Sequence, residues 1–421
     1  MKRELAFQLL QRILPNPPWD EDRLRETLED LRVLAEQKYN KYEMYQPARL
    51  FFENLYLFLN KMKEKDRTTA LQFIRNDLIY ISRDEFQQLA HVLYHDCIRQ
   101  QQLDITAMKA GIPRHRLTKL VNSQEFHRIQ RASLYVALSD GARIDYFRRQ
   151  NLDINNEQVL AAYYVGDEKI KDLRQKLREN VGDGAAQFEC IFLLDDFCGS
   201  GKTLLREVVV VTLPTSVTSF SIPDPLSGRL SFDPEKHKLQ WNYRGPLCSE
   251  ESSELEKLAT SAELRAAIEE LRQKCEQQQT EIKGSLQRIT TEKFRELVSN
   301  DAAVYFAPLL ATEYALNRLK PLLPRLSSPL DKLRVIPAAV LPDTVRISPE
   351  SAGLAELCDR YYDPTLGDEH TGNVKYGYDQ CGLPLVLHHN APNNSLFFLW
   401  ARKWGSPLFP RYERHGREAR G

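Results

Sequence analysis

Two adjacent aspartates followed by a glycine-rich loop form the densest chemical motif of the sequence, DDFCGSGKT at residues 195–203. Four apolar residues, 191–194, precede the motif and predict a buried strand. A small-residue loop that opens a helix can hold a phosphate monoester through its backbone N–H groups and the helix dipole. Carboxylates at the carboxyl edge of a parallel sheet can accept hydrogen bonds from vicinal ribose hydroxyls. Together these groups indicate a 5-phosphoribosyl site.

Each part of this motif has its own expected role. We expect Asp195 and Asp196 to be catalytic residues that fix the ribose and contact Mg²⁺ indirectly, through a metal-bound ligand. We expect residues 202–207 to begin the helix. The predicted phosphate-binding residues are Gly199, Ser200, Gly201, Lys202 and Thr203.

The ending Gly201-Lys202-Thr203 also suggests an ATP-binding P-loop, which requires the pattern G-x-x-x-x-G-K-[ST]. The first glycine of that pattern lets the chain turn around a phosphate, but the residue at its position is Asp196. The acid at this point argues against a P-loop. Two alternatives to the phosphoribosyl site stay open at this stage: a P-loop and a purely structural turn.

The stretch from Asp195 to Thr203 resembles the signature of the type I phosphoribosyltransferases: an apolar run, two acids, two variable residues and a Thr/Ser-Gly-x-Thr loop. The resemblance implies a ligand such as phosphoribosyl pyrophosphate, with Mg²⁺ and no organic cofactor. Many members carry another acid where this chain has Gly199, and in some that acid helps acid–base chemistry at the transferred base. This chain lacks the acid, and Lys202 is an addition that can pair directly with phosphate.

Four stretches resemble a narrower group, the phosphoribosyltransferase-like proteins of bacterial antiviral conflict systems, some of which accompany retron reverse transcriptases. They are LIYISRDEF at 78–86, LSDGARIDYFRR at 138–149, FLLDDFCGSGKT at 192–203 and LPLVLHHNAPNNSLFFLW at 383–400. This resemblance implies a toxin-like defence effector or a regulator. It also implies a complex with a reverse transcriptase and its RNA or DNA.

A second loop follows an apolar strand at Ser139, Asp140 and Gly141. In related folds, a loop at this place binds pyrophosphate through backbone N–H groups, and Gly141 permits the close approach. Arg143 can neutralise the departing pyrophosphate and is the third predicted catalytic residue. The alternative is a turn glycine, with Asp140 as a helix N-cap and a surface salt bridge.

Histidine and asparagine residues crowd together near the C-terminus, between two apolar runs. Their side chains can donate and accept hydrogen bonds on one ligand edge, and they can equally cap an irregular loop. Metal binding is disfavoured, because the adjacent His388 and His389 point to opposite sides of a strand. The candidate base or acceptor residues are His389, Asn390, Asn393 and Asn394.

Apolar strands alternate with helical segments along most of the chain. The sequence predicts four strand-loop-helix units. The first consists of a strand at 78–82 and the helix that follows it, and the others lie at 134–149, 190–208 and 303–319. A further strand is predicted at 333–341. This alternation predicts the α/β class: a doubly wound, mostly parallel sheet of the type I phosphoribosyltransferase kind, with a helical N-terminal region.

We expect four parts along the chain. They are a helical region at 1–70, the first part of the core at 71–209, an insertion of strand flap and charged helices at 210–300, and the second part of the core with a C-terminal cap and basic tail at 301–421. An apolar stripe in the insertion either packs on its own domain or contacts a partner or a second copy in a homo-oligomer. A helix-turn-helix-like segment at 103–123 leaves nucleic-acid binding open.

The bulk composition excludes several classes of protein. The formal net charge is zero, which gives no strong overall field for nucleic acid or membrane, and no apolar run approaches the length of a membrane span. The seven cysteines are scattered without a CxxC pair, which argues against disulfides and a zinc site. With no signal-peptide pattern at the N-terminus, we expect a cytoplasmic protein.

Two hypotheses of different kinds follow. In the first, the protein is an enzyme that makes or breaks a bond at the ribose anomeric carbon of a phosphoribosyl or nucleotide substrate. In the second, the same pocket senses a nucleotide without catalysis and controls a partner complex.

Overall fold

The computed structural model describes residues 3–411, apart from several short stretches. The stretches left out are 16–17, 46–49, 162–165, 220, 223–225, 227–228, 244–246, 287–291, 327–329 and 367–372. The chain forms two compact units: unit 1 contains Met1–Glu85 and Thr344–Gly421, and unit 2 contains Phe86–Asp343. Among the helices that are described, none combines the length and apolar character needed to cross a membrane.

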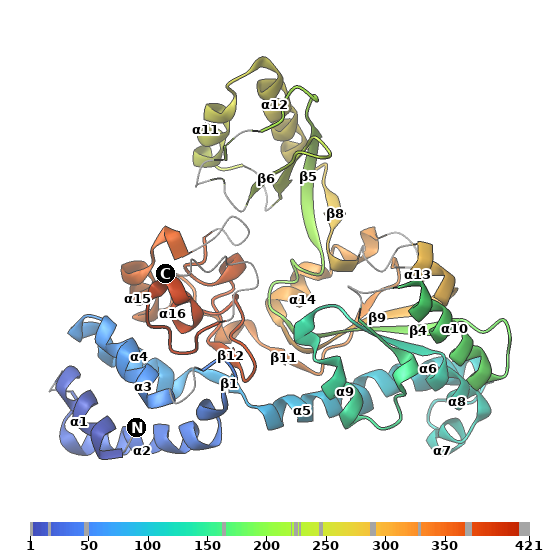
Figure 1. Cartoon of the computed structure of the whole chain (residues 1–421), viewed down its shortest axis with the longest axis horizontal. Coiled ribbons are helices and arrows are strands. Elements are labelled where there is room, and N and C mark those ends of the chain that lie inside the picture. The colour runs from blue at the N-terminus through green and yellow to red at the C-terminus, as the bar shows by residue number, and fades with distance from the viewer. Residues whose placement is uncertain are drawn as a thin grey trace. The chain divides into compact units, whose positions relative to one another are not determined.

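A parallel sheet forms the centre of unit 2 (Figure 1). The strands are β2 (Ser133–Ala137), β3 (Val159–Ala161), β4 (Phe188–Cys198), β9 (Val298–Thr312), β10 (Arg334–Val335) and β11 (Ala339–Leu341). They lie in the order β10-β9-β4-β2-β3, and β11 also pairs with β9. All pairings between these strands are parallel. The predicted α/β class with a mostly parallel sheet is therefore confirmed.

Helices and aromatic residues cover both faces of this sheet, as a doubly wound fold requires. The helices of unit 2 outside the insertion are α5 (Arg83–Val92, which begins in unit 1), a π-helical turn (Leu93–Ile98), α6 (Arg99–Ala110), α7 (Leu117–Val121), α8 (Gln124–Arg131), α9 (Ile144–Gln150), α10 (Asp167–Val181), α13 (Glu292–Leu297) and α14 (Glu313–Leu319). On one face, Leu193 packs in a core with α10, α13 and α14. On the other, Phe192 stacks between Tyr135 and Tyr305, with ring centroids 5.6 and 5.1 Å away.

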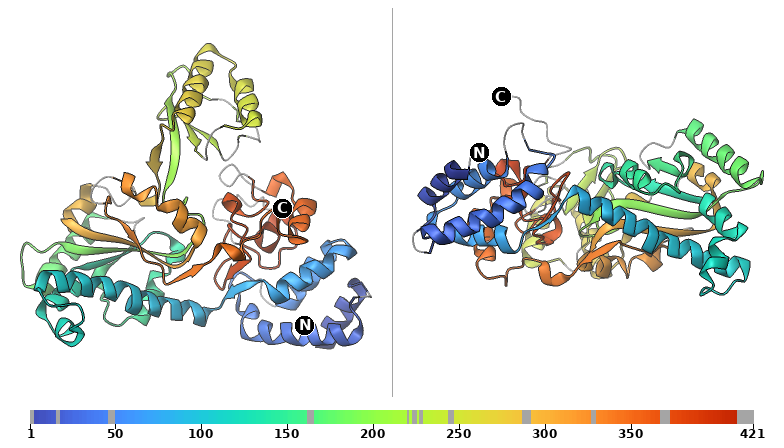
Figure 2. Two further views of the ribbon diagram at one scale, coloured as in Figure 1. Left: turned by 180° about the vertical axis from the view of Figure 1, so that it is seen from behind. Right: turned by 90° about the horizontal axis from the view of Figure 1, so that it is seen from below.

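The insertion forms a separate antiparallel sheet with its own core. Its elements are β5 (Arg206–Thr212), β6 (Leu230–Asp233), β7 (Lys238–Asn242), β8 (Glu281–Lys283), α11 (Ser249–Leu258) and α12 (Ala262–Glu276), with strand order β6-β7-β5-β8. Within the described residues, none of these strands pairs with the parallel sheet. Figures 1 and 2 show β5 and β8 side by side where the chain leaves and re-enters the parallel-sheet domain.

The apolar stripe of the insertion packs on this antiparallel sheet. Its six residues are buried in one cluster with Trp241, and they are Leu255, Leu258, Leu264, Ile268, Leu271 and Cys275. The stripe therefore stabilises its own subdomain, and contact of the insertion with a partner or a second copy stays a prediction.

The prediction that residues 202–207 begin a helix is wrong. Leu205 N–H donates to the Gly201 carbonyl at 2.8 Å, which closes one turn, and β5 begins at Arg206. The physical reason is the run of four valines at 208–211, since β-branched side chains favour a strand that packs on a sheet. The loop at 199–203 therefore leads into a strand, and no helix dipole adds to its affinity for phosphate.

Unit 1 combines the N-terminal helices with the C-terminal segment. Its elements are α1 (Arg3–Ile13), α2 (Glu21–Gln37), α3 (Phe51–Lys61), α4 (Glu64–Asn76), β1 (Ile79–Ile81), α15 (Leu354–Tyr361), β12 (Leu385–Leu387) and α16 (Phe397–Trp400). The strand expected in the main sheet at 78–82 pairs instead with β12, in a two-stranded parallel sheet. Its central residue Tyr80 is buried beside Tyr39 and Phe409. The structure thus groups residues from 344 onward with the N-terminal helices.

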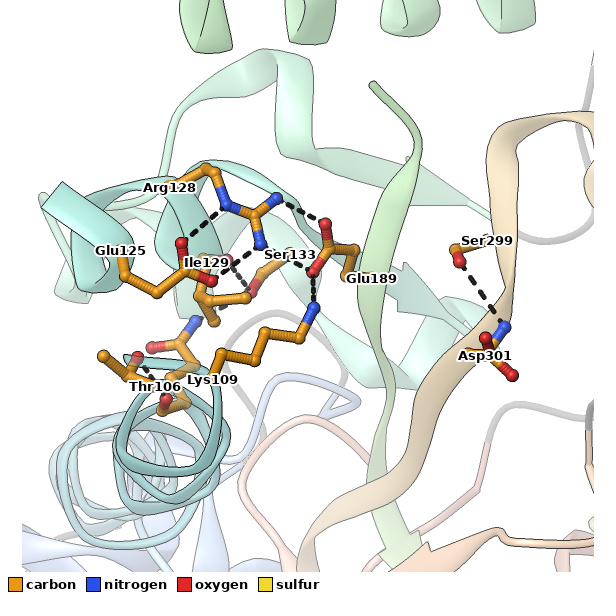
Figure 3. A network of polar contacts seen from close by, with 10 residues as sticks. Thr106, Lys109, Glu125, Arg128, Ile129, Ser133, Glu189, Ser299 and Asp301 are labelled. Atoms are coloured by element: carbon orange, nitrogen blue, oxygen red, sulfur yellow. Dashed lines mark hydrogen bonds and ion pairs between the residues drawn. The ribbon is translucent and has the colours of Figure 1, made fainter. Parts of the chain in front are cut away.

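An ion network ties the start of β4 to two helices (Figure 3). Arg128 of α8 pairs with Glu189 of β4 and, at 2.8 Å, with Glu125. Lys109 of α6 also donates to Glu189. Burial alone would raise the pKa of the Glu189 carboxyl, but Arg128 and Lys109 together hold that pKa below its usual value. The network therefore stabilises the folded state while Glu189 is ionised.

We expect Glu189→Gln to lower the free energy of unfolding by about 1–2 kcal/mol at pH 7, because it removes a charge that two cations share. A fifth of the Glu189 side chain is exposed, so solvent screening keeps the loss modest. A depressed carboxyl pKa contributes stability above the pKa of the unfolded chain, and this contribution disappears as the pH falls. Denaturant unfolding at pH 7 and pH 4 should therefore show a smaller difference between mutant and wild type at pH 4.

Glu179→Gln is the matched control, since Glu179 pairs with Lys176 on the exposed surface of α10. Its stability should stay close to that of the wild type at both pH values. Equal losses for the two variants at pH 7 would contradict the role given to the network.

Candidate functional site

Asp195 and Asp196 lie near the carboxyl end of β4, in the middle of the parallel sheet. The position predicted for them is confirmed: Asp195 is in register with Pro308 of β9, and its predecessor Leu194 is in register with Ala137 of β2. Ligands of open parallel sheets bind outside the carboxyl ends of the strands. Both residues keep some solvent exposure, although protein atoms surround most of the Asp195 carboxyl, so a ligand at this edge can reach them.

The loop after β2 is hydrogen-bonded to the first of these acids. Ser139 Oγ donates to Asp195 Oδ1 at 2.6 Å, and the same oxygen accepts the Asp196 N–H at 3.1 Å. The backbone of Leu138 also donates to the Leu194 carbonyl at 2.9 Å. The Asp195 carboxylate is therefore held in one orientation by two donors from neighbouring strand ends.

The same loop touches the second acid through its glycine. A Cβ added to Gly141 would lie 2.7 Å from Asp196 Oδ2 and 2.9 Å from Oδ1. Only glycine allows this approach without displacement of the carboxylate. The predicted pyrophosphate loop and the predicted ribose-binding acids are thus brought together, although the side chain of Asp140 lies outside the described residues.

Two negative charges at one strand end are costly. Burial raises the pKa of the Asp195 carboxyl well above its usual value, and the neighbouring charge of Asp196 raises it further, while the Ser139 hydrogen bond opposes both effects. A proton, a cation or hydroxyl donors from a ligand can each relieve this cost. Any one of them therefore stabilises the pair of acids.

The two carboxylates suit Mg²⁺, which binds proteins through one or two carboxylates and completes its shell with water and phosphate oxygens. In the part of the chain that the structure describes, no group of three or more His, Cys, Asp or Glu side chains could hold a metal ion. A metal shared with the oxygens of a bound ligand is the arrangement that Asp195 and Asp196 fit.

The predicted phosphate-binding residues form a tight turn that is anchored to the end of β9. Thr312 Oγ1 donates to the Gly199 carbonyl at 2.6 Å. Gly201 has a φ of 71°, and a Cβ at this position would lie 2.9 Å from the Leu319 side chain. The side chains of Ser200 and Lys202 are buried, and the Lys202 N–H donates to Ser200 Oγ at 3.3 Å.

Thr203 is exposed, and its backbone is where the insertion joins the loop. Its carbonyl accepts hydrogen bonds from the Ser285 N–H at 3.0 Å and Ser285 Oγ at 2.8 Å. Gly284 crosses so closely that an added Cβ would lie 1.8 Å from the Leu204 carbonyl oxygen. The contact of Ser285 and Gly284 with this loop could not be predicted from the sequence, because some eighty residues separate them from it and no local pattern marks them.

Arg143 is the N-cap residue that precedes α9, and its backbone is left-handed, with φ 44° and ψ 48°. Such a conformation costs a residue with a side chain roughly 1–2 kcal/mol, and strain of this kind is concentrated at functional sites. The guanidinium lies 5.9 Å from the centre of the Tyr146 ring. The strain is consistent with a functional position, and the role at pyrophosphate stays a prediction.

The C-terminal candidates lie in unit 1, whereas the two aspartates lie in unit 2. His389 is buried, and Asn390 closes a tight turn with Leu387. Asn394 Nδ2 donates to the Tyr378 carbonyl at 3.1 Å, and the Asn393 carbonyl accepts the Tyr378 N–H at 2.6 Å. The side chain of Asn394 therefore has the loop-capping role left open from the sequence, whereas Asn393 contributes its backbone carbonyl. A role of these residues at a base stays a prediction.

The helix-turn-helix-like segment folds as α6, a turn at the left-handed Gly111, and α7. Leu120 packs in a small core with Leu103 and Phe126. Arg114 pairs with Asp104 and Gln100 of α6, so its guanidinium serves the local structure. Nucleic-acid binding by this segment stays a prediction.

Comparison with known proteins gives a match to a protein family. A family model described as PRTase-CE matches residues 58–411, which is most of the chain. No curated protein and no solved structure matches. The matched range includes the aspartates, the loop after β2 and the C-terminal cluster.

We expect Asp195→Asn to raise the free energy of unfolding by on the order of 1 kcal/mol at pH 8. A carboxyl whose pKa is raised by folding costs stability as the pH climbs above the pKa of the unfolded chain. The amide still accepts the Ser139 hydrogen bond but carries no charge. Denaturant unfolding should therefore show a gain at pH 8 that shrinks toward pH 4.

Asp301→Asn is the control, because Asp301 is an exposed acid on β9. Its stability should match the wild type at both pH values. A variant Asp195→Asn that is less stable than the wild type at pH 8 would show that the carboxylate is a structural group.

Proposed function

The chain belongs to the PRTase-CE family, and from this premise we propose that it binds a 5-phosphoribosyl or nucleotide ligand at the carboxyl edge of the parallel sheet. The protein is phosphoribosyltransferase-like. The proposed reaction takes place at the ribose anomeric carbon, as a transfer or a cleavage.

One observation carries this proposal: the loop after β2 meets the two acids of β4. The Ser139–Asp195 hydrogen bond and the close approach of Gly141 to Asp196 put the loop after β2 beside both carboxylates. The hydroxyl groups of a phosphorylated sugar can donate to these carboxylates, and we propose that the loop receives its phosphate oxygens. An ATP site of the P-loop type requires a glycine at the position of Asp196, the residue against which Gly141 packs.

The chemistry we propose follows from the ligand. The bond from the anomeric carbon to pyrophosphate or a base breaks, and the leaving group takes the electron pair. A lone pair of an acceptor, or of water, then forms the new bond. Asp195 and Asp196 hold the ribose hydroxyls while positive charge develops on the ring, and Arg143 faces the charge of the leaving group.

Mg²⁺ would be held between these carboxylates and the phosphate oxygens of the ligand, where it would neutralise negative charge on the leaving group. Gly199 stands where many related enzymes carry an acid. The loop at 199–203 therefore offers no carboxyl group for acid–base chemistry at the base.

A second function is favoured by a specific contact. Ser285 of the insertion is hydrogen-bonded to the Thr203 carbonyl of the phosphate loop. A ligand that shifts this loop would therefore also shift the nearby pairing of β5 with β8. A catalytically silent subunit could use this connection to report nucleotide binding to a partner. We propose this sensing role as the alternative to catalysis.

The biological setting we propose is antiviral defence, in a complex with a reverse transcriptase and its RNA or DNA. Support comes from the four stretches of the sequence that resemble phosphoribosyltransferase-like proteins of conflict systems. Incubation of the pure protein with Mg²⁺, phosphoribosyl pyrophosphate and a nucleotide pool, read by mass spectrometry, separates the two roles. A new product supports the enzyme, and tight binding without any product supports the sensor.

We expect the double variant Asp195→Asn, Asp196→Asn to bind phosphoribosyl pyrophosphate roughly ten- to a hundredfold more weakly, because charge-assisted hydrogen bonds are lost. Thr203→Ala and Lys202→Ala should weaken binding through the phosphate. Thr203 is exposed, so its variant tests the contact without disturbing the fold. Calorimetric titration with this ligand and with ATP, each with Mg²⁺, provides the measurement. ATP hydrolysis that depends on Lys202, with no response to phosphoribosyl ligands, would refute the proposal.

Gly141→Ala should weaken binding of the same ligand about tenfold, since the added methyl group displaces the Asp196 carboxylate. Gly184→Ala is the control, because nothing lies within 4 Å of a Cβ at that position. Unchanged affinity in a folded Gly141→Ala protein would mean that the approach of this loop to Asp196 does not serve the ligand.

A further inference from the structure

One buried hydroxyl group connects the predicted phosphate loop to the end of β9. Thr312 is 1 % exposed, and its Oγ1 donates to the Gly199 carbonyl at 2.6 Å and accepts the Ala315 N–H at 3.0 Å. Ala311 is in register with Cys198, so Thr312 and Gly199 directly follow paired residues of β9 and β4. The hydroxyl therefore links the loop to the start of α14, at the level where the two central strands end.

This hydrogen bond sets the direction of the next peptide group. In the trans form that nearly all peptide bonds adopt, the C=O and the N–H that follows it point in opposite directions. Because Thr312 holds the Gly199 carbonyl, the Ser200 N–H points away from Thr312. In the part of the chain that the structure describes, no protein group accepts the N–H of Ser200, Gly201 or Thr203. Backbone N–H groups gathered in a turn form a binding site for an anion.

A second contact fixes the middle of the loop against the same helix. Gly201 has a φ of 71°, and a Cβ at this position would lie 2.9 Å from Cγ of Leu319 in α14. The Gly201 carbonyl also accepts the Leu205 N–H at 2.8 Å. The loop is thus supported at both ends of α14, by the hydroxyl of Thr312 and by the side chain of Leu319. A loop that is ordered before the ligand arrives loses less conformational entropy on binding, which favours affinity.

We propose that Thr312 is a positioning residue of the phosphate site. Its hydroxyl orients the peptide between Gly199 and Ser200, so that the loop directs its backbone N–H groups toward the 5-phosphate of the ligand. Thr312 acts through the loop and does not itself touch the ligand. This inference rests on the proposed function, and it adds a residue that lies more than a hundred positions beyond the aspartate motif.

The competing explanation is that the hydroxyl serves only as the N-cap of α14, and Ser123 provides a matched control for it. Ser123 is the N-cap of α8, where its Oγ accepts the Phe126 N–H at 3.1 Å and donates to the Leu120 carbonyl at 2.6 Å. Ser123→Ala therefore removes the same two kinds of hydrogen bond as loss of the Thr312 hydroxyl. It removes them between α7 and α8, where the proposed function uses no residue.

The test is calorimetric titration of the full chain with phosphoribosyl pyrophosphate and with ribose 5-phosphate, each in the presence of Mg²⁺. Thr312→Val keeps the shape of the side chain without its hydroxyl, and it should weaken binding of both ligands by the same factor, about tenfold. Thr312→Ser keeps the hydroxyl and should stay close to the wild type. Ser123→Ala should leave both affinities unchanged. If circular dichroism shows Thr312→Val to be poorly folded, Thr312→Cys replaces it, since a thiol is only a weak donor.

The outcomes separate this inference from the proposed function. A wild-type protein that binds neither ligand would overturn the proposed function and the role of Thr312 with it. Binding by the wild type that is equally tight in the folded Thr312→Val protein would overturn the role of Thr312 alone. So would a loss in Ser123→Ala as large as that in Thr312→Val, or a failure of Thr312→Ser to restore affinity.

Discussion

The parallel pairing of β2 with β4 is the constraint on which the candidate site depends. Ala137 lies in register with Leu194, so the residues that follow each strand emerge at the same level of the sheet. Ser139 then reaches the first acid, and Gly141 packs on the second. A shift of register by one residue would turn the acids toward the opposite faces and separate them from this loop. The stacked rings of Tyr135 and Phe192, which are paired residues of β2 and β4, stabilise this register.

This constraint explains why much of the site was predictable from the sequence. A strand covered on both faces must be apolar throughout, so the run at 191–194 identifies a central strand, and the acids that follow it must lie at the edge where ligands bind. The loop after β2 could be placed by the same reasoning. The two loops meet because both strands are parallel, which the alternation of strands and helices already indicated.

The failures have equally physical causes. The helix expected after Gly201 was wrong because the valine run at 208–211 gains more from pairing with β7 than a helix would gain locally. The strand at 78–82 was placed in the wrong sheet because its partner, β12, lies some three hundred residues away. Contacts between residues so far apart in the chain produce no local sequence pattern.

The crossing of Gly284 over Leu204 also bears on how the chain reaches its fold. β4 and β9 are neighbours in the sheet, yet a hundred residues separate the end of one from the start of the other. Closure of so long a loop is slow and entropically costly. The antiparallel sheet of the insertion needs only local pairing, and once formed it holds Arg206 beside Lys283. The insertion thus shortens the effective loop, and its early folding would speed assembly of the sheet edge that carries the aspartates.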